Sequence, residues 1–550
     1  MLNFSKSSPP PYTSNPYRTS RLPSPAISRR PSPSYLPLAI LRSSKSLLTK
    51  RYFRVLFLVI FSTTFLFLFL RLTSAPSFEP LQQKGLPPLF EAWKEYERTL
   101  PQHAEDDGAI KFIYMKNHVF ASGWGNALQE MILNTHLAYL SGRSFVFDNY
   151  TWDRSPSEYS TFNGKTILSR VPVSTMLAGP MIGGSFDPSY FVDPLFTIDP
   201  SSQSHPRAVS SEFYERVCAG KKKIVDSAVV RDAVANWDGK ANLEAWVKHL
   251  KSLPNRCVEI DVKSEHIFNI WMFGSPKILT LWPSLSQSPI LRQFTHSPLI
   301  LGAFERHRHL FGESRTPLSS ISNSPSNSSL PLIDLDQLPQ LYPHSPATPN
   351  INNTIPGLVV LHIRRGDFEQ HCINLVEWGA AFNGFNSFED IWEQDGFDSA
   401  AAGAGTPKYD TAKTNYLERC FPEIGQIVRR VRQVREAASL ASLKSDTQSA
   451  PLTHLYVMTN GRPPFLAELR AALELDAIAN NPLDLPPWES IYTSRDLELG
   501  WEEAYVSQAL DMYVAQRAEV FVGNGFSSLT SNILMLRKAN GVDSIKTRLW

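Results

Sequence analysis

The sequence predicts an α/β protein in two halves, and three observations lead to that class. Short apolar runs rich in β-branched and aromatic residues, typical of buried parallel strands, alternate with stretches of helical periodicity. A Ser/Pro/Asn-rich stretch without periodicity, residues 312–356, separates the two halves. At 550 residues, 42% of them apolar, the chain also exceeds what one hydrophobic core usually organises.

Each half has its own order of expected elements. The first begins as a strand–turn–helix–strand unit, with a strand over 111–115, a glycine-bearing turn over 122–126, a helix over 127–140 and a strand over 144–147. In the second we expect strands over 358–364, 454–459 and 519–523, and helices over 465–473, 501–518 and 527–540.

The sequence predicts that the chain is divided into six segments. They are a disordered cytoplasmic tail (1–50), a transmembrane anchor (52–72), a stem (73–108), an N-terminal α/β domain (109–311), a disordered insert or linker (312–356) and a C-terminal α/β domain (357–550).

The anchor is predicted from Val55 to Leu70, sixteen uncharged residues between Arg54 and Arg71. At 1.5 Å per residue the run spans about 24 Å, and the flanking arginines lengthen it by snorkelling. Basic residues before the run predict a cytoplasmic N-terminus, hence type II topology, and the short span suits ER or Golgi membranes. A cleaved signal peptide is the alternative, disfavoured by the long basic leader.

The charge distribution bears on the partners of the chain. Residues 1–54 hold ten Lys or Arg and no Asp or Glu, so the rest of the chain is acidic although the formal net charge is +2. An acidic body argues against nucleic acid as a partner, because phosphate contacts need clustered cationic surface.

A lumenal body would place its four cysteines in an oxidising compartment. Three complete pairings are possible, and the shorter loops favour Cys218–Cys257 with Cys372–Cys420. Three N-glycosylation sequons, which fit the same topology, begin at Asn149, Asn327 and Asn352.

The most informative motif is His362-Ile363-Arg364, at the end of an apolar strand. Ligands of open α/β sheets gather beyond the carboxyl ends of strands, and arginine binds phosphate oxygens through two parallel N–H groups. Because side chains alternate along a strand, His362 and Arg364 share one face while Arg365 points to the other. The alternative for Arg364 is an ion pair with a neighbouring carboxylate such as Asp367. The overlapping Arg-Gly-Asp tripeptide is too common to indicate an adhesion site.

Two further stretches combine a strand, glycines and a helix start. In one, glycines that would let a ligand approach the backbone precede Ser527 and Ser528, where free N–H groups could bind phosphate oxygens. Ordinary helix capping by these serines is the alternative. The other stretch is Gly123-Trp124-Gly125-Asn126, which lacks the full dinucleotide-binding pattern.

Taken together, these motifs resemble the GDP-fucose-dependent protein O-fucosyltransferases, most closely those that modify EGF repeats. The run from Asp511 to Ser528 has the family's Asp-x-Tyr, Phe-Ile/Val-Gly-Asn and Ser-Ser order without a gap, and the His-x-Arg and Gly-x-Gly-Asn motifs match its other two signatures. Leu529 departs from the pattern, since the family usually has Phe there. The resemblance implies two Rossmann-like domains facing a cleft (GT-B type), with GDP-fucose bound mainly by the C-terminal domain and the N-terminal domain on the acceptor side.

Roles for individual residues follow from the same resemblance. Arg364 would grip the β-phosphate and His362 would support the nucleotide sugar, with Ile363 between them. Asp511 would contact the guanine end, and Ser527, Ser528 and Leu529 the phosphate or base region. Gly123, Trp124, Gly125 and Asn126 would reach across the cleft, with Asn126 near the reacting sugar.

The implied reaction is an inverting fucosyl transfer to a Ser or Thr hydroxyl of a secretory-pathway protein, in the ER or Golgi lumen. Neither cofactor nor metal is expected, and the Asp334-Leu-Asp336 sequence in the Ser/Pro-rich insert fits chance better than metal binding. The general base is unresolved, with Asp367 as a candidate. Two rivals are a fucosyltransferase acting on a glycan hydroxyl and a non-catalytic lumenal GDP-sugar-binding protein.

Overall fold

The computed structural model describes residues 85–104, 108–186, 206–234, 237–312, 354–366, 368–399, 409–444 and 450–550. The expected tail, the anchor and nearly all of the insert over 312–356 lie outside these residues, as do residues 73–84 and 105–107 of the expected stem, Asp367 and the sequons at Asn327 and Asn352. Among the helices of the described ranges, none is long and apolar enough to cross a membrane.

The first half contains a five-stranded parallel sheet in the order β8-β2-β1-β10-β9. Its strands are β1 (Phe112–Tyr114), β2 (Ser144–Phe147), β8 (Val209–Ser210), β9 (Lys222–Val225) and β10 (Cys257–Ile260). The expected strands over 111–115 and 144–147 are β1 and β2. They pair directly in parallel, and helix α3 (Trp124–Ser141) connects them along the chain.

The second half contains a five-stranded parallel sheet in the order β14-β13-β12-β15-β16. Its strands are β12 (Ile355–Ile363), β13 (His454–Thr459), β14 (Ser490–Thr493), β15 (Ala518–Gly523) and β16 (Thr547–Leu549). Along the chain, β13 and β14 are added on one side of β12, and β15 and β16 are then added on its other side. Ligands of open α/β sheets bind beyond the strand ends at such a reversal point. The predicted α/β class with parallel sheets is confirmed.

Helices pack on both faces of the second sheet. Helices α15 (Ile424–Lys444) and α16 (Pro463–Ala479) pack on one face, and α18 (Ser507–Arg517) and α19 (Ser528–Ala539) on the other. Helices α12 (Phe368–Trp378) and α14 (Tyr409–Cys420) pack against each other. On β12, Val359, Leu361 and Ile363 belong to the apolar cluster that includes α15 and α16, whereas Leu358 and Val360 belong to the cluster on the opposite face. This alternation decides which face each residue of the following motif occupies.

Two of the expected helices differ from the prediction. Helix α3 begins at Trp124 with Gly123 as its N-cap residue, so the last residues of the expected turn form the first helical turn. The expected helix over 501–518 is two helices, α17 (Trp501–Tyr505) and α18, interrupted at Val506. The helical spacing of apolar residues continues across Val506, so the sequence pattern does not reveal the interruption.

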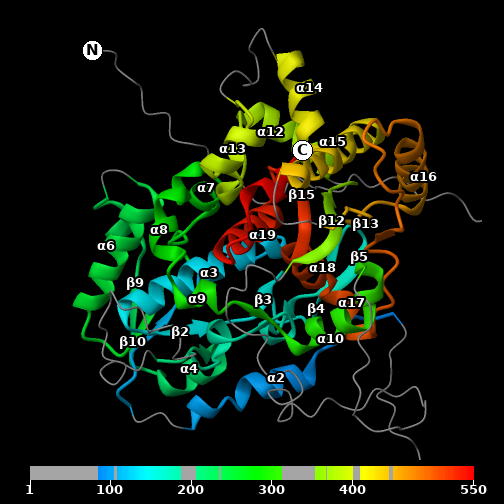
Figure 1. The fold of residues 1–550 in the computed structure, drawn as a ribbon. Helices are drawn as coiled ribbons and strands as arrows, with labels where there is room; N and C mark the ends of the chain where they lie inside the picture. Colours follow the sequence, from blue (N-terminus) through cyan, green and yellow to red (C-terminus); the bar gives the residue numbers. More distant parts are fainter. Residues whose placement is uncertain are drawn as a thin grey trace, which may run out of the picture. The chain divides into compact units, whose positions relative to one another are not determined.

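The two halves share apolar packing. One cluster of buried side chains includes residues of β1 and α3 from the first half and of α18 and α19 from the second. Figure 1 shows the red helix α19 beside the light-blue helix α3, and the two helices are in contact. The cleft between two domains, which the family resemblance implies, stays a prediction.

Both expected disulfides are confirmed. Cys218 is bonded to Cys257 and Cys372 to Cys420, each with a Cα–Cα distance of 5.8 Å. The second disulfide joins α12 to α14, and α12 directly follows the His362–Arg364 motif along the chain.

Candidate functional site

His362 lies near the carboxyl end of β12 with its side chain buried under the first turn of α19. Its Nδ1 lies 2.8 Å from Thr530 Oγ1, and Thr530 Oγ1 also accepts the backbone N–H of Asn524 at 3.1 Å. Burial, together with the positive charge of Arg364, lowers the pKa of His362 to about 3. The imidazole is therefore neutral, and the Thr530 hydroxyl hydrogen is available to donate to Nδ1.

The two arginines after β12 occupy different environments. Arg364 is half-buried, with its guanidinium 4.5 Å from the centre of the Phe368 ring. Arg365 is buried between Phe421 and Phe465, at 4.5 and 4.3 Å from the ring centres, and burial lowers its pKa to about 10. The predicted division of the two side chains between opposite faces is confirmed. Arg365 packs in the interior of the second half, which leaves Arg364 as the arginine placed for a ligand. Ile363 is also in that interior, so only its backbone borders the site.

The N-terminus of α19 lies directly after the loop that follows β15. Ser527 is the N-cap residue, and its side chain makes no capping hydrogen bond to the first turn. The expected alternative of ordinary capping by Ser527 therefore does not describe this helix. Uncapped N–H groups and the helix dipole together favour a negatively charged group at this end.

Gly523 at the end of β15 and Gly525 in the loop are needed for packing, which corrects the expectation that these glycines leave room for a ligand. A Cβ at Gly523 would lie 2.3 Å from Thr530 Cγ2, and one at Gly525 would lie 2.5 Å from the Phe382 ring. The loop is also tied down by Asn524, whose Nδ2 donates to the Cys420 carbonyl at 2.6 Å.

Gly125 brings the first half into this site. A Cβ at Gly125 would lie 2.5 Å from the backbone nitrogen of Leu529 and 2.6 Å from Ser528 Oγ, so only glycine permits this approach. The Gly125 carbonyl also accepts Asn532 Nδ2 at 2.7 Å. The first turns of α3 and α19 are thus packed backbone to backbone.

The other residues of the same motif are placed by α3. Gly123 is exposed, and Asn126 is half-buried with its Nδ2 donating to Ser122 Oγ at 2.8 Å. Trp124 is buried and meets Tyr150 edge to face, with the ring centres 5.5 Å apart.

Asp511 lies in α18, the helix that leads into β15, so its early residues lie toward the carboxyl ends of the strands. Its carboxylate accepts the Tyr456 hydroxyl at 2.6 Å and the Ser494 hydroxyl at 3.0 Å. Burial raises the pKa of Asp511 to about 6, although these two hydrogen bonds oppose the rise. Ser494 follows β14, which places Asp511 at the β13–β14 side of the edge that carries Arg364.

Two residues that sequence reasoning missed hold this edge together. Asn460, just after β13, accepts the Arg365 N–H and donates to the Arg365 carbonyl, both at 2.8 Å. Trp550 donates its indole N–H to the His362 carbonyl at 2.9 Å and its backbone N–H to the Gly523 carbonyl at 3.0 Å. Asn460 could have been found, because it is a polar residue at the end of a predicted strand. No local pattern marks Trp550.

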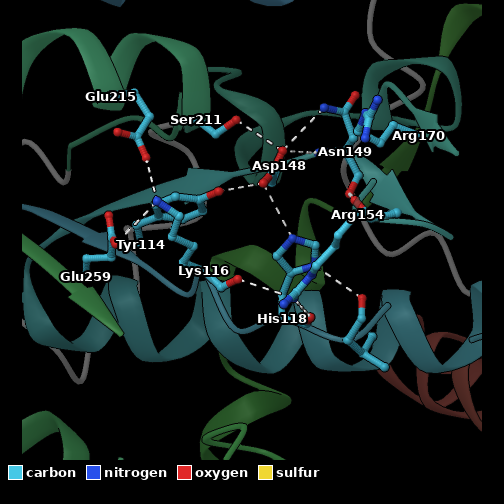
Figure 2. Close-up of polar contacts among 12 residues, drawn as sticks. Tyr114, Lys116, His118, Asp148, Asn149, Arg154, Arg170, Ser211, Glu215 and Glu259 are labelled. Carbon is cyan, nitrogen blue, oxygen red and sulfur yellow. Dashed lines mark hydrogen bonds and ion pairs between the residues drawn. The ribbon is translucent and has the colours of Figure 1, made fainter. Parts of the chain in front are cut away.

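A second polar cluster lies at the carboxyl ends of β1 and β2 in the first half (Figure 2). At its centre Asp148 accepts hydrogen bonds from the Tyr114 hydroxyl at 2.5 Å and the Ser211 hydroxyl at 3.1 Å, and lies 3.5 Å from His118 Nε2. Burial alone would raise the pKa of Asp148, but the bonds from His118 and Tyr114 outweigh it and hold the pKa below its usual range.

The same arrangement favours the charged form of His118. Burial would lower the pKa of His118, but Asp148 outweighs it and raises the pKa. Its Nδ1 lies 3.2 Å from the Val119 carbonyl, so both ring nitrogens face acceptors. Arg154 donates to the His118 carbonyl at 2.6 Å (Figure 2). The cluster therefore fixes the segment that leads from β1 to α3.

Within the described ranges, no three His, Cys, Asp or Glu side chains are grouped so that they could hold a metal ion.

Known proteins were compared by sequence and by structure. The sequence matches no protein-family model and no curated protein. Among solved structures, the fold is similar to POFUT1 in complex with GDP, with a TM-score of 0.40, 12% identity and coverage of 78% of this chain and 96% of that chain. It is similar to POFUT1 in complex with GDP-fucose, with a TM-score of 0.39, 12% identity and coverage of 78% and 94%. A mutant of Arabidopsis thaliana FUT1 in complex with GDP has a TM-score of 0.30, 11% identity and coverage of 81% and 73%.

Proposed function

We propose that this chain is a glycosyltransferase that moves fucose from GDP-fucose to a Ser or Thr hydroxyl of a secretory-pathway protein. The observation that supports it best is the convergence of three sequence motifs on the first turn of α19. Thr530 in that turn contacts His362, while the backbone of Leu529 packs on Gly125. An uncapped helix N-terminus and Arg364 then flank one edge at the reversal point of a parallel sheet, an arrangement suited to a diphosphate.

The chemistry follows from where charge develops. As the bond between the anomeric carbon and GDP breaks, the sugar gains oxocarbenium character and negative charge grows on the leaving diphosphate. Arg364 and the N-terminus of α19 would stabilise that charge more in the transition state than in the ground state, which is the condition for acceleration. Asp511 would accept N–H groups of guanine, and Asn126 would lie on the sugar side. We propose inversion at the anomeric carbon and no requirement for a metal.

The proposed location is the ER or Golgi membrane, with the anchor over 52–72, type II topology and the catalytic body in the lumen. Two disulfides in the described body agree with an oxidising compartment. Protease protection of tagged full-length chain in sealed microsomes tests this, and digestion of the body without detergent would contradict it.

The activity is tested with the purified full-length chain. Calorimetry with a panel of GDP- and UDP-sugars should give binding to GDP-fucose, and product analysis should show transfer to protein acceptors, unaffected by EDTA. Arg364→Ala should lower kcat by about 100-fold, as expected for loss of one transition-state charge contact, with partial recovery in Arg364→Lys. Arg231→Ala, which removes a half-buried arginine of the first half that pairs with Asp232 and Glu265, is the control.

The outcomes separate the three candidate functions. Transfer to oligosaccharides without transfer to protein would favour the glycan-acceptor rival. Binding of GDP-fucose with neither transfer nor hydrolysis would favour a non-catalytic binding protein. Full activity of Arg364→Ala would overturn the assignment of the site.

A further inference from the structure

The turn before α3 contains a strained residue. Ala121 has φ of 51°, in the left-handed region that residues other than glycine rarely adopt. Such a conformation persists only where the surrounding structure holds it, and strained residues are common next to functional sites. Ala121 lies directly before Ser122, Gly123 and the first turn of α3.

A short strand, β3 (Tyr150–Thr151), holds this turn from one side. The Ala121 N–H donates to the Thr151 carbonyl at 3.2 Å, and the Tyr150 hydroxyl donates to the Ser122 carbonyl at 2.8 Å. The Tyr150 ring also meets Trp124 edge to face. Strand β3 is itself fixed by antiparallel pairing with β6 (Arg170–Val171).

The turn over 121–123 also orients the side chain of Asn126. The Asn126 amide donates to Ser122 Oγ at 2.8 Å, so the position of Ser122 sets where the Asn126 side chain lies. The path from β3 to Asn126 has two steps, the Tyr150 hydroxyl to the Ser122 carbonyl and the Ser122 hydroxyl to the Asn126 amide.

We propose that Tyr150 is a positioning residue for Asn126, acting through Ser122. This inference rests on the proposed function, in which Asn126 lies beside the reacting sugar. The hydroxyl of Tyr150 does not act on substrate itself, because it is committed to the Ser122 carbonyl and burial raises its pKa, which keeps it protonated.

The test is Tyr150→Phe in the full chain, which keeps the ring on Trp124 and removes only the hydroxyl. We expect kcat for fucosyl transfer to fall about tenfold, while the Kd for GDP changes less than twofold, because GDP is bound by the second half. Tyr159→Phe is the matched control, since it removes another hydroxyl that donates to a backbone carbonyl, that of Pro87, in the same half. The control should retain full activity.

A double-mutant cycle tests the route. If Tyr150 acts through Asn126, Tyr150→Phe has no further effect in an Asn126→Ala background. An equal loss of kcat in that background, or unchanged kcat in Tyr150→Phe alone, would overturn the proposal.

A second readout does not depend on activity. The N–H groups of Asn126 and Ala127 are bonded to the Gly123 carbonyl, and hydrogen exchange at these amides should be several-fold faster in Tyr150→Phe than in Tyr159→Phe. Absence of any GDP-sugar turnover in the wild type would refute the proposed function, while unchanged exchange at the two amides would refute the positioning role.

Discussion

Replacing Gly125 by alanine should separate the first turns of α3 and α19. The added Cβ would lie 2.5 Å from the Leu529 nitrogen, whereas Cβ contacts are essentially never shorter than 3.0 Å, so the backbone must move by about 0.5 Å or more. Neither neighbour can yield cheaply, because Leu529 N belongs to a helix and the Gly125 carbonyl is bonded to Asn532. Overpacking of this kind costs about 1–3 kcal/mol.

The expected results are a lower Tm and at least a tenfold weaker affinity for GDP, because the displaced turn is the proposed diphosphate site. Thermal unfolding and calorimetry on the full chain measure the two effects. Gly425→Ala in α15 is the control, since a Cβ there meets only the end of the Arg429 side chain, at an ordinary contact distance of 3.7 Å. Its GDP affinity should stay unchanged. Wild-type affinity and Tm in Gly125→Ala would refute the packing argument and, with it, the convergence of the motifs.

Three further predictions concern the same edge. Trp550→Phe removes the indole donor to the His362 carbonyl, so we expect several-fold weaker GDP binding by calorimetry and a stability loss of about 1 kcal/mol; wild-type affinity would show that Trp550 has no positioning role. Burial raises the pKa of Asp511 to about 6, so its carboxylate takes up a proton as the pH falls through 6. The protonated group accepts fewer hydrogen bonds from guanine, so the affinity for GDP should fall from pH 7 to pH 5. Asp511→Asn should bind weakly at every pH, and an unchanged pH profile in that variant would contradict this role. Removing the Cys372–Cys420 disulfide by paired Cys→Ala substitution should lower both Tm and GDP affinity, because Cys420 holds Asn524, whereas removing the other disulfide should lower Tm alone.

Local sequence pattern was sufficient for five strands of the two parallel sheets, β1, β2, β12, β13 and β15, but not for β8, β9, β10, β14 and β16. The apolar run of β12 predicted both the strand and the division between Arg364 and Arg365, because alternation is a property of any extended backbone. The pairing of the cysteines also followed, since short loops favour closure. The same reasoning missed the interruption at Val506, because hydrophobic periodicity does not register one residue that leaves the helical conformation.

The sequence by itself determined the α/β class, the element that carries each motif and the type of chemistry that arginine, serine and glycine suggest at strand ends. Only the tertiary structure decided that these motifs meet, since Gly125 and Asn532 lie 407 positions apart and no local periodicity encodes their contact. It also decided what the glycines are for. Gly125 admits the backbone of α19, while Gly523 and Gly525 admit Thr530 and Phe382. The physical reason is that a glycine in the sequence indicates only that a side chain would not fit. Which neighbour occupies the space depends on how distant segments pack.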